Sequence, residues 1–276
     1  MNNILAIAAK EMQEGIRNRW VVATTLLLAA LALTLTFLGS APTGAVDAQP
    51  LDVVVVSLSS LTIFLLPLIA LLISHDAVVG EVERGTMLLL LSYPVSRGQV
   101  ILGKFLGHLA ILALATLVGY GAAAATLLFG EEGIAAQSWQ TFGAMIGSSV
   151  LLGAVFIALG YLVSTIARNR GTAAGAAIGL WLLFTLIYDM ALLGLLVLDQ
   201  GRMVTGGLLD TLLLLNPADA YRLFNLTGSA DARLASGMAG VAGAAGLTPT
   251  MLLAGLVAWC VLPLSLAALI LSRREL

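Results

Sequence analysis

The sequence predicts an all-α integral membrane protein with six transmembrane helices, an N-terminal interfacial helix and both termini in the cytoplasm. Hydrophobic residues make up 60% of the 276 residues and the mean hydropathy is +1.03, far more apolar surface than a soluble fold needs. Six apolar runs reach the roughly 20 residues that a helix needs to cross a bilayer. The predicted spans are Trp20–Leu38, Val53–Ser74, Phe105–Phe129, Thr141–Ile166, Thr172–Leu198 and Thr250–Leu271.

The placement of basic residues orients these spans. With six spans, most of the 13 Lys and Arg residues fall on the side of the two termini, and the rest lie in one long loop, 199–249. Basic residues near span ends mark the cytoplasmic side, whereas long loops cross the membrane largely regardless of their charge. Residues 1–276 are therefore expected to form one transmembrane domain, with the 199–249 loop facing outward.

Residues 1–19 precede the first span and are predicted to form an interfacial helix. An apolar residue recurs every fourth position, and most polar residues lie away from that stripe. The apolar stripe consists of Ile4, Ala8, Met12, Ile16 and Trp20, with Ile7 beside it. This pattern is typical of a helix lying in the membrane interface with its apolar side down; the alternative is a frayed cytoplasmic tail.

The composition excludes several classes of site. With two His and a single cysteine, Cys260, the chain has no disulfide framework and no ligand cluster for a metal ion. Gly98 to Lys104 has the spacing of a phosphate-binding loop, but Phe105 stands where Ser or Thr must hold magnesium, and a membrane span follows. We expect no catalytic residue, no bound cofactor and no nucleic-acid partner.

The most informative segment is the charged loop 75–104 between the second and third spans. Gly85 is expected to break a helix, Thr86 to cap the next one, and Met87–Leu91 to form an apolar plug that ends before Pro94. A short capped helix with an apolar tip at the membrane surface is the shape of a docking knob for a soluble partner. The alternative is a solvated turn.

Two features of the spans leave alternatives open. Glycines spaced four apart, as at Gly103 and Gly107 or at Gly175 and Gly179, let helix backbones approach closely inside the bundle or between subunits, or let a substrate approach the backbone. Asp189 is the only acidic residue deep in a span, where exposure to lipid would cost about 2.5–3.5 kcal/mol. It is expected to line an outward pathway or to serve as a structural hydrogen-bond partner.

At the charged loop the sequence resembles the permease subunits of ABC-2-type transporters. The resemblance covers the whole chain, including the span number and the long outward loop. The matching motifs are Arg17-Asn18-Arg19, Glu81-x-Glu83-x-Gly85-Thr86 and Ser92-x-Pro94-Val95-Ser96-Arg97. In that family this loop forms a coupling helix that sits in a cleft of a separate ATPase, which binds ATP and Mg. The resemblance therefore assigns ATPase coupling to Glu81, Glu83, Arg84, Gly85, Thr86, Met87 and Leu88, with a smaller contact at Arg168 and Arg170.

Within the family, the short length and residues 215–223 resemble permeases that serve maturation of nitrous oxide reductase in denitrification. That resemblance implies a homodimer in the bacterial cytoplasmic (inner) membrane, two copies of the ATPase, and a role in assembling the copper centres of the reductase. It also implies a periplasmic accessory protein docked at Asn216, Pro217, Asp219, Tyr221 and Arg222. The cargo stays open: a copper species, a sulfur species, or none. The alternatives are an exporter of a drug, lipid or glycan, and an ATP-independent carrier or membrane scaffold.

Overall fold

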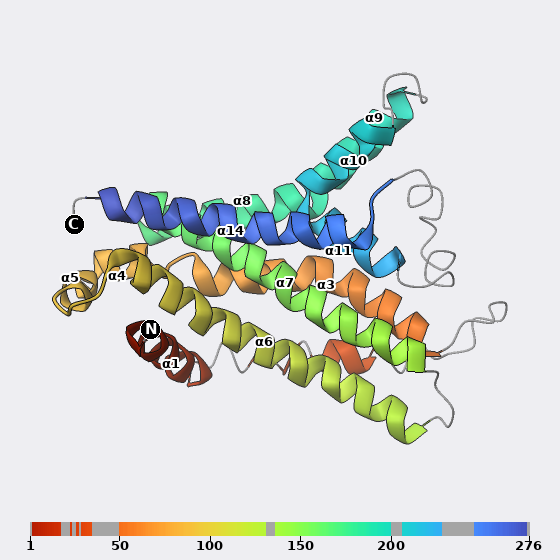
Figure 1. Ribbon diagram of the computed structural model, residues 1–276, viewed down its shortest axis with the longest axis horizontal. Coiled ribbons are helices and arrows are strands. Elements are labelled where there is room, and N and C mark those ends of the chain that lie inside the picture. The colour runs from red at the N-terminus through yellow and green to blue at the C-terminus, as the bar shows by residue number, and fades with distance from the viewer. Residues whose placement is uncertain are drawn as a thin grey trace.

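The protein is a bundle of helices in a computed structural model (Figure 1). The structure describes residues 2–17, 23, 26–27, 29–34, 50–130, 136–199, 206–227 and 246–274. The elements are α1 (Asn2–Ile16), α3 (Pro50–Ser74), α4 (Val79–Glu83), α5 (Thr86–Leu91), α6 (Arg97–Gly130), α7 (Ala136–Ile166), α8 (Arg170–Leu182), η1 (Leu183–Ile187), α9 (Tyr188–Asp199), α10 (Gly206–Leu215), α11 (Pro217–Thr227) and α14 (Pro249–Arg273).

Five helical stretches among the described residues are long and apolar enough to cross a membrane. They are α3, α6, α7, the continuous α8–η1–α9 and α14, which coincide with five of the six predicted spans. The remaining predicted span, Trp20–Leu38, lies mostly outside the described residues. Helix α6 begins at Arg97, well before the expected Phe105, because Ser96 and Gln99 hydrogen-bond each other's backbone amides and so start the helix.

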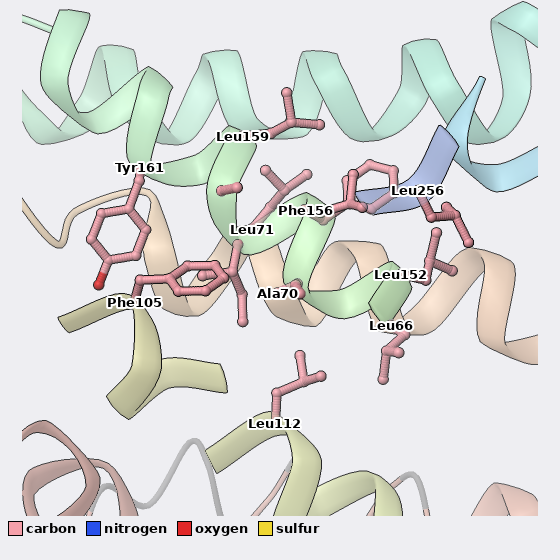
Figure 2. Packing of buried hydrophobic residues seen from close by; sticks show 14 of the residues in the cluster. Leu66, Ala70, Leu71, Phe105, Leu112, Leu152, Phe156, Leu159, Tyr161 and Leu256 are labelled. Atoms are coloured by element: carbon pink, nitrogen blue, oxygen red, sulfur yellow. The ribbon is translucent and has the colours of Figure 1, made fainter. Parts of the chain in front are cut away.

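Helix α7 is central to the bundle. It contacts α3, α6, α11 and α14, and it carries no charged side chain along its length. Figure 2 shows Leu152 and Phe156 of α7 among buried side chains of the neighbouring helices, such as Leu71 of α3, Leu112 of α6 and Leu256 of α14. Because lipid tails are as apolar as leucine, close side-chain packing of this kind is what holds such a core together in a membrane.

The two chain ends, α4 and α5 lie at one end of the bundle, which we call the loop end (Figure 1). There α1 crosses α6 at Gly103 and Gly107. A Cβ atom added at Gly107 would lie 2.5 Å from Cβ of Glu11 and 2.9 Å from the carbonyl oxygen of Ala8. One added at Gly103 would lie 2.8 Å from Cβ of Ile7. This glycine pair therefore serves packing inside the chain, one of the three alternatives for the spacing.

The predicted helix before the first span is present, but its buried face differs from the predicted stripe. Ile7 and Glu11 are buried against α6, whereas Met12 and Ile16 of the apolar stripe are exposed. The four-residue periodicity placed Glu11 among the polar residues that lie away from the stripe. The reason for its burial is an ion pair described below.

At the other end of the bundle, α9 and α10 project away from the remaining helices (Figure 1). We call these two helices the arm and this end the arm end. The arm begins where α8 passes through η1, a five-residue π-helix over Leu183–Ile187. A π-helical turn inside an α-helix changes its direction and often marks a functional site. Within the arm, the hydroxyl of Tyr188 in α9 donates to the carbonyl oxygen of Leu212 in α10, and the indole nitrogen of Trp259 in α14 donates to that of Leu214 in α10.

Helix α11 begins at Pro217, a residue whose fixed φ suits the first turn of a helix. It is not a surface helix. It packs against α14, α7 and α3, and Ala218, Tyr221 and Leu223 are buried. Part of the loop predicted to face outward is thus built into the arm end of the bundle.

The face formed by α8, α9 and α14 is apolar and largely uncovered within one chain. Gly175 and Gly179 lie on it, and a Cβ atom added at either would meet no atom within 4 Å. Unlike Gly103 and Gly107, these glycines do not serve packing among the described residues of this chain.

Candidate functional site

The charged loop folds into two short helices joined at Gly85. Gly85 has a φ of 71°, a left-handed conformation that favours glycine, and it occupies the N-cap position of α5. The expectation that Thr86 caps α5 is wrong, because Thr86 is already the first helical residue. Its hydroxyl instead donates to the carbonyl oxygen of Glu81 at 3.3 Å and closes the end of α4. The loop therefore has a defined shape and is not a solvated turn.

Helix α5 divides its apolar side chains between the protein and the solvent. Met87 is buried in the core, and Leu90 and Leu91 pack against that core. Leu88 and Leu89 point the other way and are 59% and 69% exposed. Residues three or four apart lie on the same face of a helix, so Leu90 and Leu91 share the face of Met87. Leu88 and Leu89 lie on the opposite face. The loop thus presents an apolar tip to its surroundings.

The start of α4 is fixed to α7. The hydroxyl oxygen of Ser164 accepts hydrogen bonds from the backbone amides of Val78 and Val79, at 3.0 and 3.1 Å. These amides begin α4 and would otherwise have no partner in a helix. Ser164 therefore ties the loop to the central helix.

Glu81 lies inside the protein in an ion-pair cluster. Lys104 of α6 places Nζ 2.7 Å from Oε1 of Glu81 and 2.5 Å from Oε1 of Glu11, and all three residues are buried. The structure therefore does not present Glu81 to a soluble partner, as the expected grip on an ATPase would require. Its carboxylate instead joins α4 to α6 and, through Lys104, to α1.

The cluster extends further into the bundle through a histidine and a tyrosine. Nε2 of His108 lies 3.6 Å from Oε2 of Glu11, and Nδ1 of His108 lies 2.8 Å from the hydroxyl of Tyr161 in α7. Sequence reasoning missed Glu11, Lys104 and His108 as members of one site. The four-residue spacing of Lys104 and His108, which puts both on one helix face, was the signal that could have found them.

Arg170, at the start of α8, belongs to the smaller predicted ATPase contact and joins it to the α4–α5 loop. Its backbone amide donates to Oε1 of Glu83 at 3.0 Å, and its guanidinium donates to the carbonyl oxygen of Gly80 at 3.1 Å. Nε of Arg170 also lies 3.4 Å from Oε2 of Glu83. The two cytoplasmic contacts predicted separately are therefore one connected surface. Arg168 and Arg84 are exposed beside it.

Two further arginines connect helix ends at the loop end. Arg97 donates to the carbonyl oxygens of Leu271 and Arg274 at 2.7 and 2.6 Å, and Arg274 donates to that of Thr165 at 2.9 Å. Cations are favourable at the C-terminal ends of helices, where unpaired carbonyl groups gather. Arg97 and Arg274, two of the basic residues that predicted the cytoplasmic side, therefore also link α6, α14 and α7.

A groove of about 520 Å³ lies between α1 and the α4–α5 loop. It is lined by Lys10, Glu14, Glu81, Arg84, Thr86, Leu89, Leu90 and Tyr93. Charged side chains of α1 and of the loop face this groove beside the apolar residues of α5. A partner that contacts the exposed tip would therefore also lie close to α1.

A second polar cluster lies at the arm end and includes Asp189. One guanidinium nitrogen of Arg222 lies 2.7 Å from Oδ2 of Asp189, and the other lies 2.9 Å from Oδ1 of Asp219. The side-chain amide of Asn216 donates to Oδ2 of Asp219 at 2.9 Å and to the carbonyl oxygen of Phe184 at 3.0 Å. The structure thus brings Asp189 together with the residues predicted for docking a partner.

The residues predicted to dock a periplasmic protein are mostly buried. Asn216, Pro217, Asp219 and Tyr221 have little or no contact with solvent, and only Arg222 is partly exposed. The hydroxyl of Tyr221 lies 2.9 Å from that of Ser149 in α7. The side chains of these residues hold α11 inside the bundle, and a direct contact through them has no support in this geometry.

The chain is similar to known proteins over nearly its whole length. The family model described as ABC-2 family transporter protein matches residues 5–276. The chain is 48% identical over 274 residues to a probable ABC transporter permease protein NosY of Pseudomonas aeruginosa, and the match covers 99% of both chains. It is 45% identical over 275 residues to the protein of the same description from Stutzerimonas stutzeri, again over 99% of both chains. Both ends of the bundle lie within these matches.

Proposed function

The chain belongs to the ABC-2 family of transporter proteins, and we propose that, as an ABC transporter permease subunit, it receives movement from a separate ATPase through the α4–α5 loop. ATP and Mg are bound by that ATPase, and this chain performs no hydrolysis itself. The observation that carries the proposal is the exposed apolar tip of α5, formed by Leu88 and Leu89, on a loop whose other side chains fix it to four helices. Exposed leucines on a fixed loop are typical of a surface that is covered by a partner.

The contacts of the α4–α5 loop support transmission of movement from the ATPase to the transmembrane helices. Ser164 links the start of α4 to α7, Arg170 links its middle and end to α8, and Glu81 links it to Lys104 of α6. Lys104 continues the link to Glu11 of α1. A displacement of the tip therefore reaches several helices at once. In this proposal Glu83, Arg84 and Arg168 contact the ATPase, while Glu81 and Met87 act from inside by fixing the loop.

We further propose that two copies of the chain associate through the face of α8, α9 and α14. This face is apolar and uncovered, and Gly175 and Gly179 on it have free space beside their backbones. Glycines at this spacing allow a second helix to approach closely in a membrane. Two permease copies would present two loops to a pair of ATPases in the bacterial cytoplasmic membrane.

The specific role we propose is assembly of the copper centres of nitrous oxide reductase. Its support is the resemblance of residues 215–223 stated above and the full-length similarity to two permeases named NosY. A periplasmic accessory protein would then meet the arm end. Because Asp219 and Tyr221 are buried, the exposed side chains of the arm are better placed for such a contact.

The test combines purification with one substitution. The tagged chain is purified gently from its native membrane, and co-purifying proteins are identified by mass spectrometry. We expect an ATPase and a periplasmic protein in stoichiometric amounts. Leu89→Asp should abolish co-purification of the ATPase, whereas Leu117→Asn, a change of an exposed leucine on α6 away from the proposed subunit contact, should retain it. An ATPase bound equally well by Leu89→Asp would show that the tip is not the contact.

The role in copper-centre assembly needs its own measurement. Deleting the gene should yield nitrous oxide reductase with depleted copper centres, detected by its visible absorption and copper content. The wild-type chain should restore them, and Leu89→Asp should not. Normal copper centres in the deletion strain would leave the permease standing as an exporter of another cargo, such as a drug, lipid or glycan. No ATPase partner at all would favour a carrier or scaffold.

A further inference from the structure

The polar cluster at the arm end holds two carboxylates against one arginine. Arg222 pairs with Asp189 through one guanidinium nitrogen and with Asp219 through the other. The amide of Asn216 reaches both carboxylates, at 2.9 Å from Asp219 and 3.4 Å from Asp189. Two ionised carboxylates beside one guanidinium leave one negative charge without a cation. A single proton on one carboxylate makes the cluster neutral.

The cluster is located where the arm joins the bundle. Asp189 is in the first turn of α9, directly after the π-helix, whereas Asp219 and Arg222 belong to α11, which is packed inside the bundle. Asn216 connects α10 to α11 and donates to the carbonyl oxygen of Phe184 within η1. Attraction or repulsion within the cluster therefore acts directly between the arm and the bundle.

The environment of Asp219 favours the protonated state. Asp219 is in α11, outside the candidate spans, and burial together with the nearby charge of Asp189 raises its pKa to about 7, against the opposing effect of Arg222. Burial disfavours the charged form of a carboxyl group, and a second carboxylate at close range does the same. A carboxyl group in this position exchanges its proton near neutral pH.

The other elements around α11 contribute few titratable groups. Helix α7 carries no charged residue, α14 has Cys260 and, in its last turn, Arg273, and α3 has only Asp52 in its first turn. Helix α9 adds Tyr188, whose hydroxyl donates to a carbonyl oxygen of α10, and Asp210 of α10 accepts a hydrogen bond from the backbone of Gly246. The balance of charge at Asp219 is thus set by Asp189 and Arg222.

We propose that Asp189, Asp219, Arg222 and Asn216 form a proton-binding site that fixes the arm to the bundle. With the proton on Asp219, Arg222 and Asp189 form a neutral pair, and the protonated carboxyl group adds a hydrogen bond to the cluster. Loss of the proton places two negative charges across the junction of α9 and α11. Their repulsion loosens the arm about the π-helix at its base. The pH on the arm side of the membrane then sets how firmly the arm is held.

The proton itself is tested by infrared difference spectroscopy of the full chain in lipid nanodiscs, between about pH 5.5 and about pH 8.5, which bracket the expected titration. We expect the carbonyl stretch of a protonated carboxylic acid at the lower pH, lost at the higher pH with a midpoint near 7. Asp219→Asn should remove this signal while keeping the shape of the side chain. Asp210→Asn, a change of an acidic residue in the arm outside the cluster, should retain it. A signal unchanged in Asp219→Asn would overturn the site.

The position of the arm is tested by spin-label distances on the same protein. Labels are placed at the exposed Leu208 of α10 and Val118 of α6, outside the proposed subunit contact, in a Cys260→Ser background. Labelled chain is diluted with unlabelled chain so that each pair reports one molecule. We expect the distance distribution to broaden or lengthen as the pH rises through 7 in the wild type. It should stay in its low-pH form in Asp219→Asn. A distance distribution that does not change with pH in the wild type would overturn the proposed control of the arm by Asp219. An equal shift in Asp219→Asn would overturn it too.

Discussion

Lys104 and Glu81 form an ion pair of 2.7 Å inside the protein, between a transmembrane helix and the loop that presents the apolar tip. The same ammonium group lies 2.5 Å from Glu11 of α1. A single cation thus holds together three separate elements, α1, α4 and α6. An exposed pair between the same residues would stabilise little, but burial makes the removal of either partner costly because the other is left as an unpaired charge.

Lys104→Met should therefore destabilise the protein strongly. The substitution leaves Glu11 and Glu81 buried beside each other without a cation, and breaking a buried pair in this way costs roughly 3–5 kcal/mol. Thermal unfolding of the detergent-purified chain measures the loss. Adding Glu11→Gln and Glu81→Gln to Lys104→Met should recover most of the stability, since no buried charge is then unpaired.

The control for this prediction is the exposed pair of α1. Lys10 and Glu14 lie 3.4 Å apart with more than half of each side chain in solvent, so Lys10→Met should change the stability by less than about 0.5 kcal/mol. A Lys104→Met protein as stable as Lys10→Met would show that the cluster does not hold the loop.

Gly107→Ala should displace α1 from α6. The added methyl group would lie 2.5 Å from Cβ of Glu11 and 2.9 Å from a backbone oxygen of α1, so the helix must move away. Gly121→Ala in the same helix is the matched control, because nothing lies within 4 Å of its added atom and alanine favours a helix by about 1 kcal/mol over glycine. Protease cleavage within α1 measures the displacement; equal cleavage of the two variants would contradict close packing at Gly107.

The sequence predicted five helices long and apolar enough to cross a membrane because apolar length is a local property. Each of the five confirmed spans is a continuous run that needs no knowledge of its neighbours, and the break at Gly85 follows from one residue's conformational freedom. The buried ion pairs could not be predicted from local sequence patterns, because their members come from different helices. Glu11 and Lys104 read as polar surface residues until the fold brings them together. Asp219 reads as an exposed loop residue until α11 is packed against α7 and α14.

The stability of the chain should fall as the pH rises from about 4 to about 7 through the titration of Asp219. Its pKa is raised from 3.8 to about 7 in the folded protein, so the folded state keeps a proton that the unfolded chain has lost. The stabilisation is fully present below pH 3.8 and is lost as the pH passes 7. One proton gives a slope of up to about 1.4 kcal/mol per pH unit in this window.

Thermal unfolding at several pH values measures this slope. Asp219→Asn should remove the contribution of this group, since the amide cannot ionise, and should leave the remaining pH dependence of the chain intact. Asp210→Asn should keep the wild-type slope. A slope that persists unchanged in Asp219→Asn would assign the pH dependence to other groups.

Gly175→Leu should disrupt the proposed dimer without unfolding the single chain. Within one chain the added side chain has free space, because no atom lies within 4 Å of a Cβ at this position. In a dimer formed through α8, α9 and α14 the same side chain would hold the two backbones apart at the point of closest approach. Mass measurement of the chain in nanodiscs should report dimers for the wild type and monomers for Gly175→Leu. Gly147→Leu, another open glycine but on α7, should remain dimeric; loss of the dimer in both variants, or in neither, would place the subunit contact elsewhere.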